Sequence, residues 1–237
     1  MSRILTEDQM NAFQRDGYLF PLPIMSEKDA GEYYKLFQSV EDGCGGTLAG
    51  PVRYKPHLLI TWLNELVRHP LILDAVEDVI GPNILCWASS FFNKEMRDPS
   101  YVSWHQDSTY WGLSEPQVVS AWVAFTPSQR ENGCMQVIPG THTLEQIPHL
   151  DTPGDHNLLT RGQEVEVDVD EDQAVDIELK AGEMSLHHIR LIHGSPPNFS
   201  NQRRIGYAIR YIPTHVRQLH SNEDTASLVR GEDRFNN

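Results

Sequence analysis

The spacing of hydrophobic and polar residues divides the chain into a helical first third and a strand-rich remainder. Thr6 is followed three residues later by Gln9, which is the spacing of a capping box at the start of a helix, and Gly17 ends that helix. The pair Gly81-Pro82 breaks the last helical pattern. The predicted helices begin after Thr6, at Ser26, near Leu58 and at Pro70.

Short runs rich in β-branched and aromatic residues alternate with turn residues from residue 83 onwards. This texture predicts a β-sandwich or barrel rather than a parallel sheet with crossover helices. Between Glu164 and Asp170, valines alternate with acidic residues, which predicts a strand with one buried and one solvated face. The predicted strands are residues 84–92, 118–125, 135–138, 165–169, 174–179, 184–186 and 204–211.

The length of 237 residues fits a single globular domain, because all-β domains reach about 250 residues. Within one domain over residues 1–237 we expect a helical part over about 1–82, a β core over about 83–213 and a polar tail over 214–237. Nineteen Lys and Arg against 33 Asp and Glu give a net charge of −14, which disfavours binding to nucleic-acid phosphates.

The composition also bears on location. No apolar run approaches the roughly 18 residues of a membrane helix, and the first residues lack the apolar segment of a secretory signal. Three cysteines without a Cys-x-x-Cys pair argue against a disulfide framework or a zinc site. We therefore expect a cytoplasmic protein with no membrane or nucleic-acid partner; its oligomeric state is not specified by the sequence.

Candidate chemistry begins with the segment Trp104-His105-Gln106-Asp107. Residues two apart in a strand face the same side, so His105 and Asp107 can present an imidazole and a carboxylate to one point. A further histidine, His193, follows in the sequence Ile192-His193-Gly194-Ser195. Two histidines and one carboxylate on one face of a metal suit non-haem Fe(II) with open positions for oxygen and a cosubstrate.

Arg204 opens a strand-like run eleven residues after His193. A guanidinium beside an iron site can grip a carboxylate through two hydrogen bonds, as needed for the distal carboxylate of 2-oxoglutarate. The Ser195 hydroxyl can add a hydrogen bond to that carboxylate. Arg203 points the other way in a strand and is the better candidate for a surface ion pair.

Several segments of the chain share the order and spacing of a known enzyme family. They are Trp104–Asp107, Ala121–Ala124, Asn132–His142, His187-His188, Ile192–Ser195 and Arg203–Tyr207. Over about residues 5–213 the sequence resembles the phytanoyl-CoA dioxygenase family of Fe(II)/2-oxoglutarate oxygenases. The resemblance implies a mainly β fold, a cupin-like double-stranded β-helix (jelly roll) with flanking N-terminal α-helices.

The resemblance also assigns roles to individual residues. It implies that His105, Asp107 and His193 ligate the iron, that Arg204 and Ser195 hold the distal carboxylate of 2-oxoglutarate, and that Trp122 lines this pocket. Halogenases among such relatives have Gly or Ala in place of the carboxylate ligand, so the Asp at position 107 favours hydroxylation.

Other residues near these motifs have less specific expectations. His187 and His188 are rival ligands by composition, and we expect His188 to serve as a hydrogen-bond partner of the ligands rather than as a ligand. The aromatic residues that flank the metal segment either pack in the barrel or form a wall of the substrate pocket. The tentative substrate contacts are Lys94, Trp104, Tyr110 and Trp111.

The predicted function is therefore an Fe(II)/2-oxoglutarate-dependent dioxygenase acting on a small-molecule metabolite. It would hydroxylate an unactivated C–H bond while 2-oxoglutarate and O2 are converted to succinate and CO2. Two alternatives stay open at this point. The same site can serve desaturation, ring formation or halogenation, and a cupin-like barrel can act as a binding protein without turnover.

Overall fold

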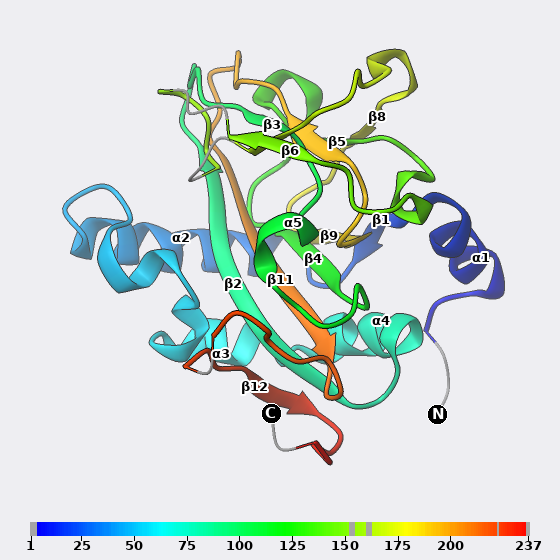
Figure 1. Cartoon of the computed structure of the whole chain (residues 1–237). Helices are drawn as coiled ribbons and strands as arrows, with labels where there is room; N and C mark the ends of the chain where they lie inside the picture. Colours follow the sequence, from blue (N-terminus) through cyan, green and yellow to red (C-terminus); the bar gives the residue numbers. More distant parts are fainter. Residues whose placement is uncertain (1–3, 152–154, 160–162, 222, 236–237) are drawn as a thin grey trace.

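The computed structural model describes residues 4–151, 155–159, 163–221 and 223–235. Most of its helical residues lie in the first third of the chain, as the sequence predicts, and one short helix lies within the β core (Figure 1). The α-helices are α1 (Glu7–Asp16), α2 (Glu27–Gly43), α3 (Thr61–Leu66), α4 (Pro70–Ile80) and α5 (Ser108–Trp111).

The first two helices begin at the residues that the sequence indicates. The Thr6 side chain accepts a hydrogen bond from the backbone N–H of Gln9, and the Gln9 side chain accepts one from the backbone N–H of Thr6. Gly17 ends α1 with a φ of 84°, a conformation that glycine adopts without strain. Ser26 caps α2 by accepting a hydrogen bond from the N–H of Asp29.

The strands form two larger antiparallel sheets and one two-stranded ribbon. The six-stranded sheet has the order β1-β9-β4-β11-β2-β12, the four-stranded sheet the order β3-β10-β5-β8, and β6 pairs with β7. The strands are β1 (Tyr18–Pro23), β2 (Ile84–Lys94), β3 (Val102–His105), β4 (Val119–Ala124), β5 (Met135–Val137), β6 (His149–Asp151), β7 (Gln163–Val165), β8 (Val175–Ile177), β9 (Glu183–His188), β10 (His193–Ser195), β11 (Arg204–Pro213) and β12 (Ser227–Arg230).

The six-stranded sheet separates a helix-covered core from the interior of the jelly roll. Alternate residues of β11 point to opposite faces. Tyr207 and Ile209 pack in the main apolar core with Phe37 of α2 and with side chains of α3 and α4. Ala208 and Arg210 face the interior and line a cavity there. The expected jelly roll with N-terminal helices is confirmed, and its interior is where polar residues gather.

One predicted strand is wrong in its extent. The alternating stretch after Glu164 was expected to form a strand over 165–169, but β7 ends at Val165, and Val167 is 47% exposed. The Glu166 N–H still donates to the carbonyl oxygen of Pro148, the residue before β6, but proline has no N–H to return, and the pairing of β6 with β7 ends there. The alternation of valine with acidic residues therefore reflects a solvated segment beyond the ribbon.

The expected polar tail contains an additional strand. Strand β12 pairs with the outer side of β2 and completes the six-stranded sheet. Before it, Asp224 forms an ion pair with Lys55 and accepts a hydrogen bond of 2.7 Å from the indole N–H of Trp87. The tail thus contacts β2, a strand that also lines the interior of the jelly roll.

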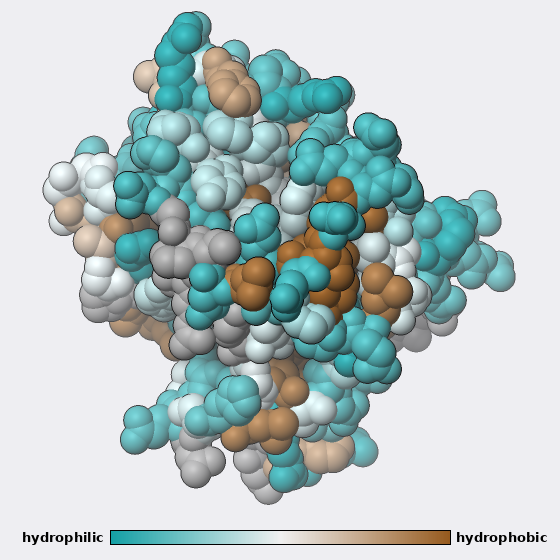
Figure 2. All heavy atoms as spheres, turned by 45° about the horizontal axis from the view of Figure 1, so that its top comes forward, coloured by the Kyte–Doolittle hydropathy of each residue, from teal (hydrophilic) through white to brown (hydrophobic). Residues whose placement is uncertain are grey.

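The visible surface is mostly hydrophilic. In the view of Figure 2, apolar residues gather near the middle of the face and are surrounded by hydrophilic ones. Over the described ranges, no helix combines the length and apolar character needed to cross a membrane.

Candidate metal centre

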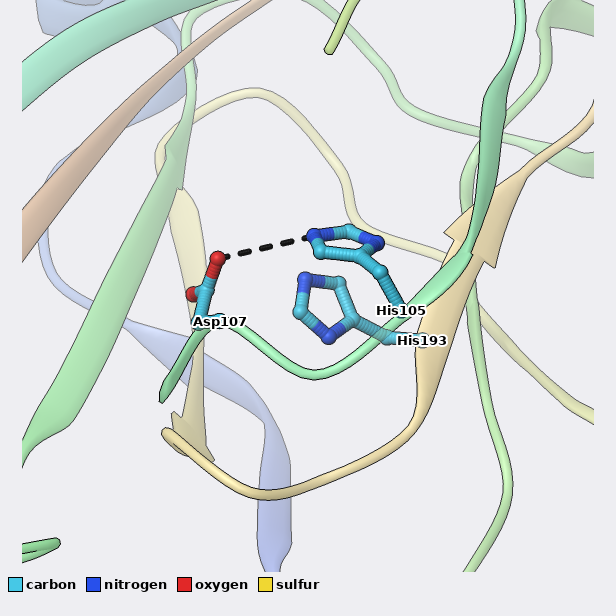
Figure 3. Close-up of side chains that lie close together, drawn as sticks. All are labelled: His105, Asp107 and His193. Carbon is cyan, nitrogen blue, oxygen red and sulfur yellow. Dashed lines mark ion pairs between the residues drawn. The ribbon is translucent and has the colours of Figure 1, made fainter. Parts of the chain in front are cut away.

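Three side chains converge on one point, two from strands of the four-stranded sheet and one from the segment that follows β3 (Figure 3). His105 ends β3 and His193 begins β10, and the two residues are direct partners in the antiparallel pairing of these strands. Asp107 lies two residues beyond the end of β3, where the backbone is already helical. One ligand atom of each residue lies within 4.8 Å of the others, and His105 Nε2 is 3.5 Å from Asp107 Oδ1.

The hydrogen bonds of the two histidines fix which ring nitrogen faces the centre. His105 Nδ1 lies 2.9 Å from the carbonyl oxygen of Ser103, and His193 Nδ1 lies 2.9 Å from that of Leu191. A carbonyl oxygen only accepts, so each Nδ1 carries the hydrogen and each Nε2 keeps a free lone pair. This is the arrangement by which proteins orient histidine ligands of a metal ion. The donor set therefore fits Fe(II).

The electrostatics give the protonation states that a metal requires. Burial raises the pKa of Asp107, but the interactions with His105, His193 and Arg210 outweigh burial and hold that pKa well below its usual range. Burial, aided by His105, holds the pKa of His193 well below its usual range. At neutral pH the centre thus contains a carboxylate and an imidazole with a free lone pair.

A small cavity of about 40 Å³ connects this triad with the predicted oxoacid residues. Arg204, Ser195 and Trp122 line it together with the three candidate ligands. Arg204 donates a hydrogen bond to the carbonyl oxygen of Gly133, while its buried Nε has no hydrogen-bond partner. A buried donor without a partner is costly, which indicates that a ligand completes it.

Trp122 packs against β11 close to this guanidinium. The Arg204 Cζ atom is 5.5 Å from the centre of the Trp122 ring system. A Cβ atom at Gly206 would lie 1.9 Å from the same ring, so only glycine lets the indole cross the strand here. The structure thus brings together all three residues expected at the oxoacid end.

Lys94 lies at this end as well. It was tentatively expected to contact the substrate, but its side chain is fully buried, and its Nζ donates a hydrogen bond of 2.7 Å to Ser195 Oγ. Burial, followed by the charge of Arg204, lowers the pKa of Lys94 to about 6. Lys94 is not among the described residues that line the small cavity, nor among those that line the larger cavity beside it. Its nearest functional neighbours are therefore Ser195 and Arg204.

A second, larger cavity of about 590 Å³ opens beside the triad. Its walls include the aromatic residues Tyr54, Trp87, Phe91, Phe92 and Trp111. Asp107 and Arg210 line both cavities, so they mark the junction between the metal centre and this space. A volume of this size suits an organic molecule, since ligand pockets span roughly 300–1,000 Å³.

The aromatic residues expected near the substrate divide into separate groups. Trp111 lies in the wall of the larger cavity. Trp104 precedes His105 in β3 and faces the other side, where its indole N–H donates to Glu171 Oε1 at 3.0 Å. The side chain of Tyr110 lies outside the described part of the structure.

Sequence reasoning placed neither His187 nor Arg210 beside the triad, although it named His187 as a rival ligand by composition. His187 is buried beside the triad, with its Nε2 4.0 Å from Asp107 Oδ2, whereas His188 turns away and packs against His142. The neighbour of the triad is thus His187 and not His188. The second missed residue is Arg210, and its even spacing from Arg204 in one strand was a signal that both share a face.

Comparison with known proteins adds to this geometry. The family model for phytanoyl-CoA dioxygenase matches residues 50–206. A probable alpha-ketoglutarate-dependent hypophosphite dioxygenase of Stutzerimonas stutzeri is 29% identical over 188 residues, which are 77% of this chain and 60% of the relative. The peroxisomal phytanoyl-CoA dioxygenase of Homo sapiens is 30% identical over 224 residues, 83% of this chain and 65% of the relative. The chain spans less than two thirds of the length of these relatives.

Solved structures resemble nearly the whole chain. The non-heme monooxygenase ThoJ in its apo form has 34% sequence identity and a TM-score of 0.85, covering 95% of this chain and 85% of ThoJ. CytC3 with Fe(II) and alpha-ketoglutarate has 27% identity and a TM-score of 0.73, covering 98% of this chain and 91% of CytC3. Because the family model spans well over half of the residues, the chain belongs to the phytanoyl-CoA dioxygenase family.

Proposed function

We propose that this protein is an Fe(II)/2-oxoglutarate-dependent oxygenase that hydroxylates a C–H bond of a small organic molecule. The observation that carries the proposal is one small cavity lined both by a buried His-Asp-His triad and by Arg204 with its buried, unpartnered Nε. A protein that only binds a metal has no need of an oxoacid anchor. Membership of the family and the likeness to CytC3 with Fe(II) and alpha-ketoglutarate support iron as the cofactor and 2-oxoglutarate as the cosubstrate.

The roles of the triad follow from its tautomers and charge. The Nε2 atoms of His105 and His193 and one oxygen of Asp107 would hold Fe(II), and three protein ligands leave coordination positions for the cosubstrate and O2. With 2-oxoglutarate and O2 bound, the iron supplies the oxidising power for the C–H bond, and succinate and CO2 are released. Asp107 occupies a ligand position that a halogenase leaves to a halide, which favours hydroxylation.

The oxoacid end positions the cosubstrate. Arg204 and Ser195 donate hydrogen bonds to the distal carboxylate of 2-oxoglutarate, and Trp122 supports the guanidinium from below. Lys94 supports this end by holding Ser195, because its amine donates a hydrogen bond to Ser195 Oγ. Burial of all four side chains excludes water from this carboxylate.

The larger cavity receives the substrate. It meets the metal centre at Asp107 and Arg210, and its inner wall includes Phe92 and Trp111. Aromatic walls favour a molecule with an apolar or planar body. Among the substrate contacts expected from the sequence, Trp111 is the one that lines this cavity. We expect the reacting carbon of the substrate to lie close to it.

The test is an anaerobic titration of the purified protein with Fe(II) and then 2-oxoglutarate, followed by visible absorbance. We expect a charge-transfer band only when both are present. His105→Gln should abolish the band, whereas His142→Gln, a histidine in the loop after β5, should retain it. Absence of the band in the folded wild-type protein would overturn the proposal. A band without succinate release in air, for every substrate offered, would favour a binding role.

A further inference from the structure

The short segment 105–107, which carries two of the candidate metal ligands, is contacted by a histidine from outside the two larger sheets. Gln106 separates His105 from Asp107, and its backbone N–H donates a hydrogen bond of 2.9 Å to His149 Nε2. His149 is the first residue of β6 and thus belongs to the two-stranded ribbon of β6 and β7. A side chain of the ribbon therefore binds the main chain between the two ligands. We call residues 105–107 the ligand segment.

The other ring nitrogen of His149 fixes its tautomer. His149 Nδ1 lies 2.8 Å from the carbonyl oxygen of Ile147 and 2.9 Å from the hydroxyl oxygen of Thr109. A carbonyl oxygen only accepts, so Nδ1 carries the hydrogen, and Nε2 keeps the lone pair that accepts from the Gln106 N–H. Both ends of the imidazole are engaged, so the ring is held against the ligand segment.

The N–H that His149 binds belongs to the peptide unit that joins His105 to Gln106. Because a peptide unit is planar, a hydrogen bond to its N–H restrains the orientation of the whole unit. Strand β3 ends at His105, and Asp107 already has helical backbone angles, so the chain changes direction within the ligand segment. The direction in which the Asp107 carboxylate points relative to His105 therefore depends on the peptide unit that His149 holds.

The side chain of Gln106 is anchored separately. It is 1% exposed, and its amide oxygen accepts hydrogen bonds of 2.9 Å from the Ile147 N–H and from the Gln146 side chain. Its amide nitrogen donates to the carbonyl oxygen of Arg190 at 2.8 Å, in the segment that leads into β10. These bonds hold the side chain of Gln106, whereas the bond to His149 holds its main chain. The two anchors thus restrain different parts of the ligand segment.

We infer that His149 is a positioning residue of the metal centre. It holds the peptide unit after His105 in the orientation that lets the ligand atoms of His105 and Asp107 meet at one point. His149 is not a member of the triad and is not among the described residues that line the small cavity, so it acts through Gln106 and not on the ion. This inference rests on the proposed function.

The alternative role for His149 is to attach the ribbon to the rest of the barrel. The connection between β6 and β7 supplies Leu158 and Leu159 to the wall of the larger cavity, and Asn157 of this connection donates to Ser103 Oγ at 2.9 Å. A residue that only attached the ribbon would affect the stability of the protein, but it would leave the geometry of the triad unchanged. The test must therefore report on the metal ligands themselves.

The absorption of bound Co(II) provides such a test without turnover, because its d–d bands depend on the number and geometry of its ligands. In His149→Leu the Gln106 N–H loses its acceptor. We expect a shifted d–d spectrum and a Co(II) affinity that is lower by about three- to tenfold. His149→Gln carries an amide group that reaches the place of Nε2, so it should restore the wild-type spectrum and most of the affinity.

His156→Leu is the matched control. His156 is an exposed histidine in the connection of the same ribbon, and its backbone carbonyl accepts a hydrogen bond from the Tyr101 N–H, which the substitution retains. This variant should keep both the spectrum and the affinity of the wild-type protein.

The inference is overturned if His149→Leu keeps the wild-type spectrum and affinity, even where its thermal stability falls, because His149 would then only attach the ribbon. It is also overturned if His149→Gln is altered as much as His149→Leu. Should His149→Leu not fold, His149→Asn decides instead, since its shorter side chain stays polar beside Ile147 but does not reach the Gln106 N–H. The same spectral shift is expected there. A wild-type protein that binds no Co(II) would instead contradict the proposed function.

Discussion

Lys94 of β2 and Arg204 of β11 are direct partners on neighbouring antiparallel strands, and both side chains are buried. Burial removes the hydration of the Lys94 amine, and the adjacent charge of Arg204 repels its proton, which is why the pKa of Lys94 falls to about 6. Asp98 opposes this shift without cancelling it. At neutral pH the amine is thus largely uncharged and can take up a proton when an anion binds beside it.

This pair predicts proton uptake on cosubstrate binding. A carboxylate held by Arg204 and Ser195 raises the pKa of the neighbouring Lys94 amine, so near pH 7.5 we expect up to about one proton to be bound per 2-oxoglutarate. Calorimetry in two buffers of different ionisation enthalpy measures this number. Lys94→Met should abolish the uptake and lower the affinity by about three- to tenfold. Equal heats in both buffers for the wild-type protein would contradict the prediction.

Asp107→Ala should abolish hydroxylation and weaken Fe(II) binding by at least about tenfold. The variant keeps both imidazoles but removes the anionic ligand, and the two neutral donors alone neither balance the metal charge nor complete the triad. Fe(II) affinity and succinate release are the two measurements. An active variant would disprove the role of Asp107 as a ligand.

Gly206→Ala should disrupt the oxoacid end. The added methyl group would lie 1.9 Å from the Trp122 ring, so the indole must move out from beneath Arg204. We expect a loss of about 1–3 kcal/mol in the free energy of unfolding and weaker 2-oxoglutarate binding. Urea denaturation and calorimetry check the two effects.

The matched control is Gly31→Ala in α2. A Cβ atom there meets no other atom within 4 Å, and alanine favours the helix, so we expect a gain of about 0.5–1 kcal/mol and unchanged binding. If both glycine variants behaved alike, the contact of Gly206 with Trp122 would not explain the result.

Asp224→Asn should loosen the wall of the larger cavity. The change keeps the shape of the side chain but removes the charge that pairs with Lys55, and it weakens the bond from Trp87 Nε1. We expect a loss of about 1 kcal/mol, which lowers the Tm by roughly 2–4 °C. Thermal unfolding gives the answer, with Glu223→Gln as the exposed neighbour that should change nothing.

Local signals in the sequence predicted the helices and the main strands well. The cap of Thr6 and the turn at Gly17 are each determined by a few neighbouring residues. They can therefore be predicted without considering the rest of the chain. The extent of the strand after Glu164 was wrong because it depends on the length of its partner β6. Pairing partners lie far apart in sequence and are not visible from one segment alone.

The same contrast between local signals and long-range pairing applies to the residues of the site. The spacing of His105 and Asp107, together with the family resemblance, identified the residues that converge on one centre. Which of His187 and His188 faces that centre depends on the phase of β9 against β4, since a shift of one residue exchanges the two faces. Arg210 escaped notice because it lies outside the sequence segments that carry the family resemblance.

The direct pairing of His105 with His193 ties the metal centre to a long-range strand pairing. The two histidines are 88 positions apart, so their strands meet only after a long loop has closed. Until then the chain offers a metal ion only the local couple of His105 and Asp107, which is too few donors to hold it firmly. The ion can therefore stabilise the folded barrel but cannot nucleate it, and tight metal binding reports that the long-range pairing of β3 with β10 is in place.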